Sequence, residues 1–225
     1  MKRMPEINPI KKPPVLKDWA YQWIKDRIIR SQYPPGSLLK IEALSRELGI
    51  SRTPIREAML RLEQEGLVVT RRRVGSYVAE FSTQEFVELL EIRALLEGFG
   101  VQSLAGLLTE AELSELENMI SACESAVNGG NPAAFTAHDI AFHNYLMERA
   151  PNPWLVKLMR PIESLRVRQR SIAPENLDHV IASLAEHRAI YEALRAVNGA
   201  QANARMNEHL RAIRERLLPK NPTQQ

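Results

Sequence analysis

The stretch LSRELGISRTPIREA (residues 44–58) predicts two helices that meet at a tight turn. The first helix covers residues 41–48 and ends at Gly49, because glycine readily adopts the left-handed conformation that closes a helix. The hydroxyl of Ser51 can cap the next helix, and a proline such as Pro54 fits its first turn. The spacing therefore predicts a helix–turn–helix.

Segments before and after this pair complete a small domain. The expected elements are a helix over residues 16–31, a turn at 33–36, the two helices just described with the second ending at Gly66, strands at 67–70 and 76–79, and a basic turn at 71–75. The prolines of the turn at 33–36 lack backbone N–H donors and so end the first helix, and β-branched residues favour the strands. Three helices followed by a basic hairpin predict a winged helix-turn-helix domain over residues 16–80.

Basic side chains gather where such a domain meets DNA. Arg52 and Arg56 lie one turn apart at the start of the third helix, where a recognition helix contacts base edges. The planar fork of an arginine can donate two hydrogen bonds to guanine. The alternative is that both are solvated charges paired with Glu57 or Glu63. The predicted DNA contacts are Arg52, Thr53, Arg56, Arg71, Arg72, Arg73 and Gly75. The glycine either lets the backbone approach the minor groove closely or serves only to form the turn.

Charge is divided unevenly along the chain. Residues 1–80 carry 16 Lys and Arg against 9 Asp and Glu, a net charge of +7, and residues 81–225 carry 14 against 18, a net charge of −4. A basic first third joined to an acidic remainder favours contact of the first part with a polyanion. On charge alone, ordinary fluctuation of surface charge explains the asymmetry equally well.

Composition limits the class of protein and its compartment. Hydrophobic residues make up 44% and charged residues 25% of the chain, and no apolar run reaches the roughly 20 residues of a membrane span. Residues 1–15 are basic, lack the apolar core of a signal peptide and are expected to form a flexible arm. One cysteine, Cys123, excludes an internal disulfide and fits a reducing cytoplasm. A cytoplasmic location is therefore expected.

After the hairpin, every segment reads as helix. Ser82-Thr83-Gln84-Glu85 is a capping box that opens the first of these helices. Short loops between helices favour antiparallel packing of neighbours. The sequence thus predicts a mainly α fold, with an antiparallel six-helix bundle over residues 83–218 and a tail at 219–225. The helices are expected at residues 83–108, 109–130, 131–150, from 154 onward with Pro161 inside, 174–197 and 200–218.

The spacing of histidines in this bundle suggests a metal site. Asp139 and His143 are four residues apart, so they lie on one face of a helix. His187 and His209 are 22 residues apart across a short turn, so antiparallel packing can bring them level. A carboxylate and three imidazoles suit a transition metal of borderline softness. The alternative is that each histidine is an ordinary core or surface residue.

The first domain closely resembles the GntR family of regulators over residues 16–80. The resemblance is carried by Tyr33-Pro34-Pro35-Gly36-Ser37-Leu38, by residues 44–58 with their Ser-Arg-Thr-Pro-x-Arg-Glu-Ala run, and by residues 62–67. It implies that Arg52, Thr53 and Arg56 contact DNA and that the wing enters the minor groove. Some relatives carry a DNA-contacting arginine where this chain has Glu42. Phosphate repels a carboxylate, so that contact is expected to be absent or changed.

The bundle is similar to the FCD-type ligand-binding domain of FadR-like GntR regulators. The match spans about residues 83–218 and is carried by Arg93-x-x-x-Glu97, Asp139-x-x-Phe142-His143-x-x-Leu146, Glu186-His187-x-x-Ile190 and Glu208-His209-Leu210. In metal-containing members an aspartate and three histidines hold the ion, which implies the ligands Asp139, His143, His187 and His209. His138 is rotated about 100° from its neighbour along the helix and is expected to face elsewhere, whereas His179 is a plausible substitute ligand.

The resemblance also implies what this domain binds. The expected cofactor is one divalent transition metal per chain (zinc, nickel and manganese are not distinguished), without an organic cofactor. Four protein ligands leave two positions of an octahedral ion, where the carboxylate of a small organic acid can replace water. Arg93 is expected to pair with that acid by bidentate geometry. The alternative is a structural ion pair between Arg93 and Glu97.

Together these features predict a DNA-binding transcription regulator, expected to act as a repressor, whose operator affinity is controlled by an acid bound at the metal site. A homodimer on an inverted repeat in double-stranded DNA is expected, because two-fold symmetry doubles the readout of one recognition helix. One alternative is a DNA-binding protein whose bundle only dimerises it around a structural metal. The other is a metal-dependent hydrolase, which the lack of a His-Glu-x-x-His motif disfavours. Neither catalytic residues nor a membrane partner are expected.

Overall fold

The computed structural model describes residues 15–80, 82–172 and 176–218. The chain divides into two compact units, the first ending at Ala79 and the second beginning at Glu80. The predicted flexible arm (except Val15), the tail at 219–225 and the expected helix start at Pro174 lie outside the described residues.

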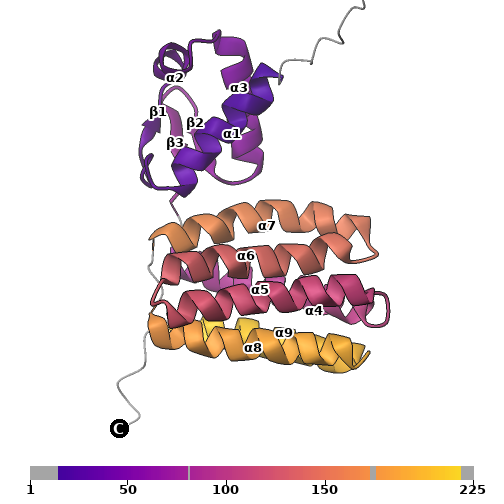
Figure 1. Cartoon of the computed structure of the whole chain (residues 1–225). Coiled ribbons are helices and arrows are strands. Elements are labelled where there is room, and N and C mark those ends of the chain that lie inside the picture. Colours follow the sequence, from indigo (N-terminus) through magenta and orange to yellow (C-terminus); the bar gives the residue numbers. More distant parts are fainter. Residues whose placement is uncertain (1–14, 81, 173–175, 219–225) are drawn as a thin grey trace, which may run out of the picture. The chain divides into compact units, whose positions relative to one another are not determined.

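The described part of the first unit contains three helices and three short strands (Figure 1). Its elements are α1 (Leu16–Ile29), β1 (Leu38–Leu39), α2 (Ile41–Leu48), α3 (Arg52–Gln64), β2 (Val68–Arg71) and β3 (Gly75–Val78). The strands form an antiparallel sheet in the order β1-β3-β2, in which β2 and β3 make the hairpin. The predicted winged helix-turn-helix is confirmed.

Packing between α1 and α3 determines which face of α3 is free. Ile24 and Ile28 of α1 and Ile55 and Leu62 of α3 are all buried, and the two helices pack against each other. The opposite face of α3 is therefore exposed. Gly49, with φ +66°, ends α2 in the left-handed conformation as predicted.

Two local features of this unit differ from expectation. Ser51 is the N-cap residue of α3, but its side chain makes no capping hydrogen bond in the described residues, so a hydroxyl cap was the wrong reason for the helix start. The strand β1 was not predicted. Leu38 pairs with Tyr77 and Leu39 with Ser76, so this strand forms through pairing with a distant segment.

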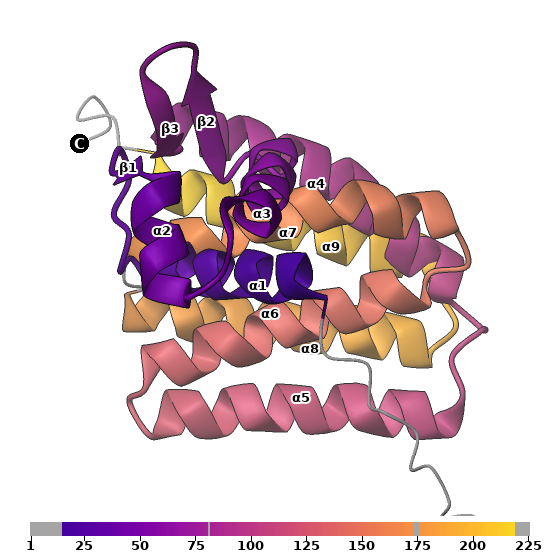
Figure 2. The same cartoon turned by 90° about the horizontal axis from the view of Figure 1, so that it is seen from above.

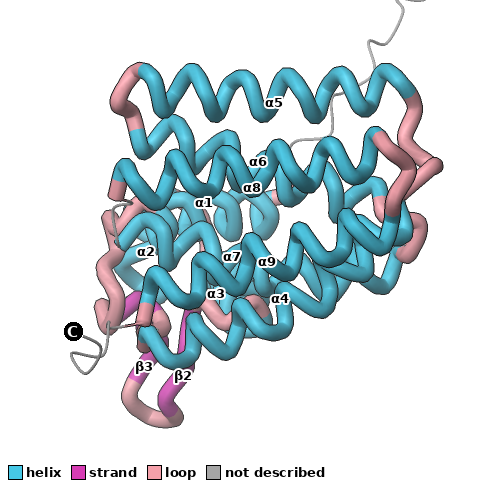
Figure 3. The backbone as a smooth tube through the Cα atoms, turned by 90° about the horizontal axis from the view of Figure 1, so that it is seen from below, coloured by secondary structure: helices cyan, strands magenta, loops and turns pink. Residues whose placement is uncertain are grey.

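The second unit is a bundle in which every described element is a helix, as predicted (Figures 1 and 3). Its helices are α4 (Thr83–Leu104), α5 (Glu110–Asn128), α6 (Pro132–Arg149), α7 (Pro153–Ile172), α8 (Leu177–Arg195) and α9 (Gly199–Leu217). Within this unit α5 packs on α6, α4 on α7 and α8 on α9 (Figure 2). In the described residues no helix combines the length and the apolar character needed to cross a membrane.

Side-chain caps stabilise most helix starts in the bundle. Both Ser82 and Thr109 form capping boxes, which start α4 and α5. α4 ends at Leu104, four residues before the expected end, and Gly106 follows with φ +82°. The side chain of Asn176 accepts a hydrogen bond from the backbone of α8, which fixes the start of that helix.

Small residues let α4 and α9 approach closely. A Cβ at Gly98 would lie 2.7 Å from Nδ2 of Asn207, and one at Gly199 would lie 2.7 Å from the backbone oxygen of Gln102. Larger side chains would push the two helices apart, because packed interiors leave little free space. The helix that carries His209 is thereby held against the helix that carries Glu97.

Candidate metal centre and nucleic-acid interface

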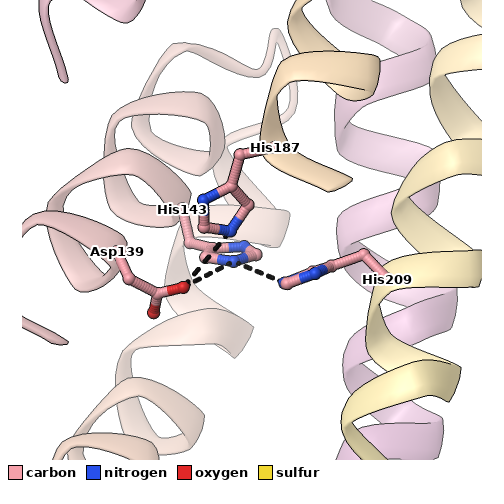
Figure 4. Close-up of side chains that lie close together, drawn as sticks. All are labelled: Asp139, His143, His187 and His209. Atoms are coloured by element: carbon pink, nitrogen blue, oxygen red, sulfur yellow. Dashed lines mark hydrogen bonds and ion pairs between the residues drawn. The ribbon is translucent and has the colours of Figure 1, made fainter. Parts of the chain in front are cut away.

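Four side chains from three helices converge inside the second unit (Figure 4). Asp139 and His143 come from α6, His187 from α8 and His209 from α9, and each is at most 1% exposed. One ligand atom from each residue lies within 4.8 Å of the others. The structure thus brings together the four residues that the sequence predicted as metal ligands.

The contacts within this cluster are close. Nε2 of His143 lies 3.2 Å from Nε2 of His209, and Nε2 of His187 lies 3.2 Å from Oδ1 of Asp139. The same oxygen lies 3.8 Å from Nε2 of His143. Imidazole nitrogens and one carboxylate oxygen are the donors that zinc and similar transition metals prefer.

Carboxylates outside the cluster fix the orientation of two rings. Oε2 of Glu97 lies 2.5 Å from Nδ1 of His143, and Oε2 of Glu186 lies 2.7 Å from Nδ1 of His209. Because a carboxylate accepts, Nδ1 of each ring must donate, and Nε2 of each neutral ring then presents a lone pair. Two lone pairs 3.2 Å apart repel each other unless a positive charge lies near them. This arrangement fits a bound cation.

Protonation of His209 does not supply this positive charge, because the ring is buried. Removal from water lowers the pKa of His209 to about 3, despite the hydrogen bond to Glu186. For Glu186, burial raises the pKa, but the hydrogen bonds and charge interactions with His209 and Arg216 outweigh burial, so the pKa is lowered. The ring is therefore neutral and the carboxylate ionised at pH 7, the forms in which they suit a metal site.

Each of these two carboxylates also binds an arginine. Nε of Arg93 lies 2.6 Å from Oε1 of Glu97, and both side chains are at most 1% exposed. Nη2 of Arg216 contacts Oε1 of Glu186, and its Nη1 donates to Ser183 at 3.0 Å. The Arg93–Glu97 pair is the contact that the sequence left open as an alternative. Pairing of Arg93 with an acid stays a prediction.

Sequence reasoning missed the contacts that Glu97 and Glu186 make with histidines. Glu186 adjoins His187 in sequence, but its side chain contacts His209 on the next helix. The Arg-x-x-x-Glu spacing was a signal for the Arg93–Glu97 pair, but no sequence signal connects either glutamate to a particular histidine. His138 is half-buried and His179 exposed, and the cluster includes neither.

Packing positions the third histidine. The ring of His187 stacks on Phe142 with centroids 4.6 Å apart, and a more distant stacked contact joins it to Phe135 at 6.3 Å. Among the described residues, Nδ1 of His187 has no hydrogen-bond partner. The orientation of this ring therefore depends on aromatic contacts and on Asp139.

The predicted recognition residues lie at the exposed start of α3. Arg52, Thr53 and Arg56 are all exposed. Nη1 of Arg52 lies 3.4 Å from Oε1 of Glu42, the residue that stands in place of an arginine in some relatives. Both side chains are more than half exposed, so the pair is weak and can open for DNA.

The two acids named as alternative partners contact other groups. Glu57 pairs with Lys17, and Glu63 accepts a hydrogen bond from the backbone of Thr70. The specific pairing of the recognition arginines with Glu57 or Glu63 was therefore wrong.

The wing residues are exposed at the β2–β3 turn. Arg71, Arg72 and Arg73 all face solvent, and the guanidinium of Arg71 lies 5.1 Å from the ring centroid of Tyr77. Gly75 has φ +144°, and a Cβ there would lie 2.7 Å from Cδ1 of Leu38. The hairpin itself thus requires this glycine, and its approach to a groove stays a prediction.

Comparison with known families matches both units. Residues 16–78 match the model described as bacterial regulatory proteins, gntR family, and residues 88–212 match the FCD domain. The HTH-type transcriptional regulator LutR of Bacillus subtilis (strain 168) is 31% identical, with 84% of this chain and 94% of LutR covered. The Uxu operon transcriptional regulator of Escherichia coli (strain K12) is 29% identical, with 87% and 84% covered.

Solved structures show the same fold. A putative transcriptional regulator GntR from Rhodococcus sp. RHA1 superposes with a TM-score of 0.76 at 21% identity, covering 91% of this chain and 98% of that one. E. coli McbR/YncC gives a TM-score of 0.74 at 23% identity, with the same coverage. LutR and the Uxu operon regulator are both transcriptional regulators.

Proposed function

Because the chain belongs to the GntR family of bacterial regulatory proteins and carries an FCD domain, we propose that it is a metal-dependent, acid-responsive repressor. It is a DNA-binding transcription regulator and not an enzyme. The proposal is that a small organic acid binds at the buried centre of the FCD domain and changes operator affinity. Binding to chromosomal DNA implies that the regulator works in the cytoplasm.

One observation carries this proposal: an aspartate and three histidines meet in the interior of the FCD domain with ligand atoms within 4.8 Å. Asp139, His143, His187 and His209 would hold one divalent transition metal. When bound, the ion supplies positive charge and open coordination positions to which a carboxylate can bind. Zinc, nickel and manganese all accept this donor set.

The helix α4 can connect this centre to the DNA-binding unit. It carries Glu97, which contacts His143, and only residues 79–82 separate it from β3 of the wing. An acid alters operator affinity only if it binds the DNA-competent and DNA-incompetent forms with different affinity. We propose that the DNA-competent and DNA-incompetent forms differ in the position of α4, and that binding of the acid shifts this helix.

A homodimer on an inverted repeat completes the proposal. One recognition helix reads too few base pairs for specificity, whereas two related by a two-fold axis read twice as many. An exposed apolar row on α4, formed by Ile92, Leu95 and Phe99, supports association with a second copy. Each of these side chains is 49% exposed or more.

The role of Arg93 gives a test of the proposed acid site. Arg93→Lys keeps a positive charge beside Glu97 but loses the bidentate fork. We expect acid-free operator affinity to stay within about twofold, and the acid concentration for half-maximal response to rise about tenfold, as loss of one charge-assisted hydrogen bond implies. The measurement is fluorescence anisotropy on an operator selected from random duplexes, titrated with small carboxylic acids.

The control is Arg149→Lys, a partly exposed arginine of the same unit that pairs with Glu112. It should leave the response unchanged. An undiminished response in Arg93→Lys would remove Arg93 from the acid site. Loss of operator binding without acid would show that its role is structural.

A further inference from the structure

We infer that the pairs Arg93–Glu97 and Arg216–Glu186 are positioning pairs that direct Nε2 of His143 and His209 toward the metal, and that the first pair contributes more to metal affinity. This inference rests on the proposed metal site. Neither pair includes a predicted metal ligand, and each reaches the centre through a different histidine.

The Glu97 pair is sealed from water. Oε1 of Glu97 accepts a hydrogen bond from Nε of Arg93 at 2.6 Å, and Oε2 accepts one from Nδ1 of His143 at 2.5 Å. The side chain of Glu97 is 0% exposed. Both oxygens are therefore engaged, and the carboxylate cannot turn without breaking a buried ion pair. The Nδ1–H tautomer of His143 is fixed as a result.

The Glu186 pair has the same connectivity at the edge of the unit. Oε2 of Glu186 accepts a hydrogen bond from His209, and Oε1 accepts one from Arg216. Arg216 also donates to Ser183. The side chains of Arg216 and Glu186 are 18% and 23% exposed. Water can therefore replace a lost contact here, whereas it cannot reach Glu97.

The two pairs leave the net charge of the centre unchanged. Each Arg–Glu pair is neutral overall, so it orients a ring without adding net charge to the site. Asp139 and three neutral imidazoles would then leave a divalent ion with a net charge of about +1. That residual charge favours a monoanionic carboxylate as the additional ligand, in agreement with the proposed acid effector.

Substitution of each glutamate by its amide tests the inference. Loss of an outer-shell carboxylate typically weakens metal binding about 10–100-fold. We expect Glu97→Gln near the upper end of this range and Glu186→Gln near the lower end. The matched control is Glu208→Gln, since Glu208 adjoins His209 in sequence but pairs with Arg205 on the surface and is 48% exposed. Its metal affinity should equal that of the wild type.

The full-length chain is stripped with a chelator and titrated with Zn²⁺ against a chromophoric competitor to obtain Kd. The absorption spectrum of the Co²⁺-loaded protein reports how the donor atoms are arranged around the ion, and melting of the metal-free proteins reports stability alone. A weakened Kd and an altered Co²⁺ spectrum in Glu97→Gln, beyond those in Glu186→Gln, support the inference. Equal Kd values for Glu97→Gln, Glu208→Gln and the wild type, or a larger loss in Glu186→Gln, overturn it.

Glu97→Gln leaves the Arg93 charge buried without its carboxylate, which can destabilise the fold. A second variant tests the inference without that buried charge. Arg93→Met combined with Glu97→Gln removes both charges at similar volume, and the same loss of affinity is expected. Wild-type affinity in a folded double variant would overturn the inference. Failure of the wild type itself to bind Zn²⁺ or Co²⁺ would instead overturn the proposed metal site.

Discussion

His209→Ala should release the metal and lower the melting temperature of the full chain by about 10 °C. An ion present at about 1,000 times its Kd contributes about 4 kcal/mol, and each kcal/mol moves the melting temperature of a protein of this size by about 2–4 °C. The effect is large because the ion would link α6, α8 and α9, and His209 is fully buried among its other ligands. His187→Ala should act in the same direction.

Elemental analysis and thermal melting of purified variants check this prediction. The control is His138→Ala, since His138 adjoins Asp139 in sequence but is not part of the cluster. That variant should retain about one metal ion per chain. Full occupancy in both His187→Ala and His209→Ala would show that other residues hold the ion.

Replacement of the recognition arginines should have the largest effect on DNA binding. Arg52→Ala and Arg56→Ala should each cost about 1–3 kcal/mol of operator affinity if they make bidentate contacts to guanine. Both side chains are exposed, and within the described part of the chain Arg52 would have to give up only its solvent-exposed ion pair with Glu42. Binding titrations on the selected operator and on a scrambled duplex measure the loss.

Two kinds of control separate base recognition from charge. Arg72→Ala and Arg73→Ala should weaken binding to both duplexes and reduce its salt dependence, as expected for phosphate contacts. Lys17→Ala removes one exposed charge from α1 and should leave sequence preference intact. Unchanged operator affinity in both recognition-helix variants would refute their assignment.

Local signals in the sequence determine most of the fold. The capping boxes at Ser82 and Thr109 and the left-handed Gly49 lie within a few residues of the boundaries they set, so sequence alone places those helices well. The strand at Leu38 could not be predicted in this way because it forms only by pairing with Tyr77. The early end of α4 involves Gly106, whose left-handed conformation the helical pattern did not reveal.

The candidate site shows the same division between local and distant information. The i,i+4 spacing of Asp139 and His143 predicted a shared face, and the 22-residue separation of His187 and His209 predicted that these two lie at the same height on neighbouring helices. The family resemblance then implied all four as ligands. The contacts of Glu97 with His143 and of Glu186 with His209 cross between helices, so they depend on helix rotation and register. The ion pair between Glu42 and Arg52 likewise joins two helices, so it also depends on how those helices pack.

The central claim is that a buried metal centre makes operator affinity respond to an acid. The most direct measurement is operator affinity of metal-loaded and metal-free protein, each with and without a panel of small carboxylic acids. We expect at least one acid to change the operator Kd of the metal-loaded protein by about 5–150-fold, the usual range of allosteric coupling, and to leave the metal-free protein unchanged. Tight operator binding that is identical with every acid in both metal states would contradict the claim and leave the helical domain a dimerisation module.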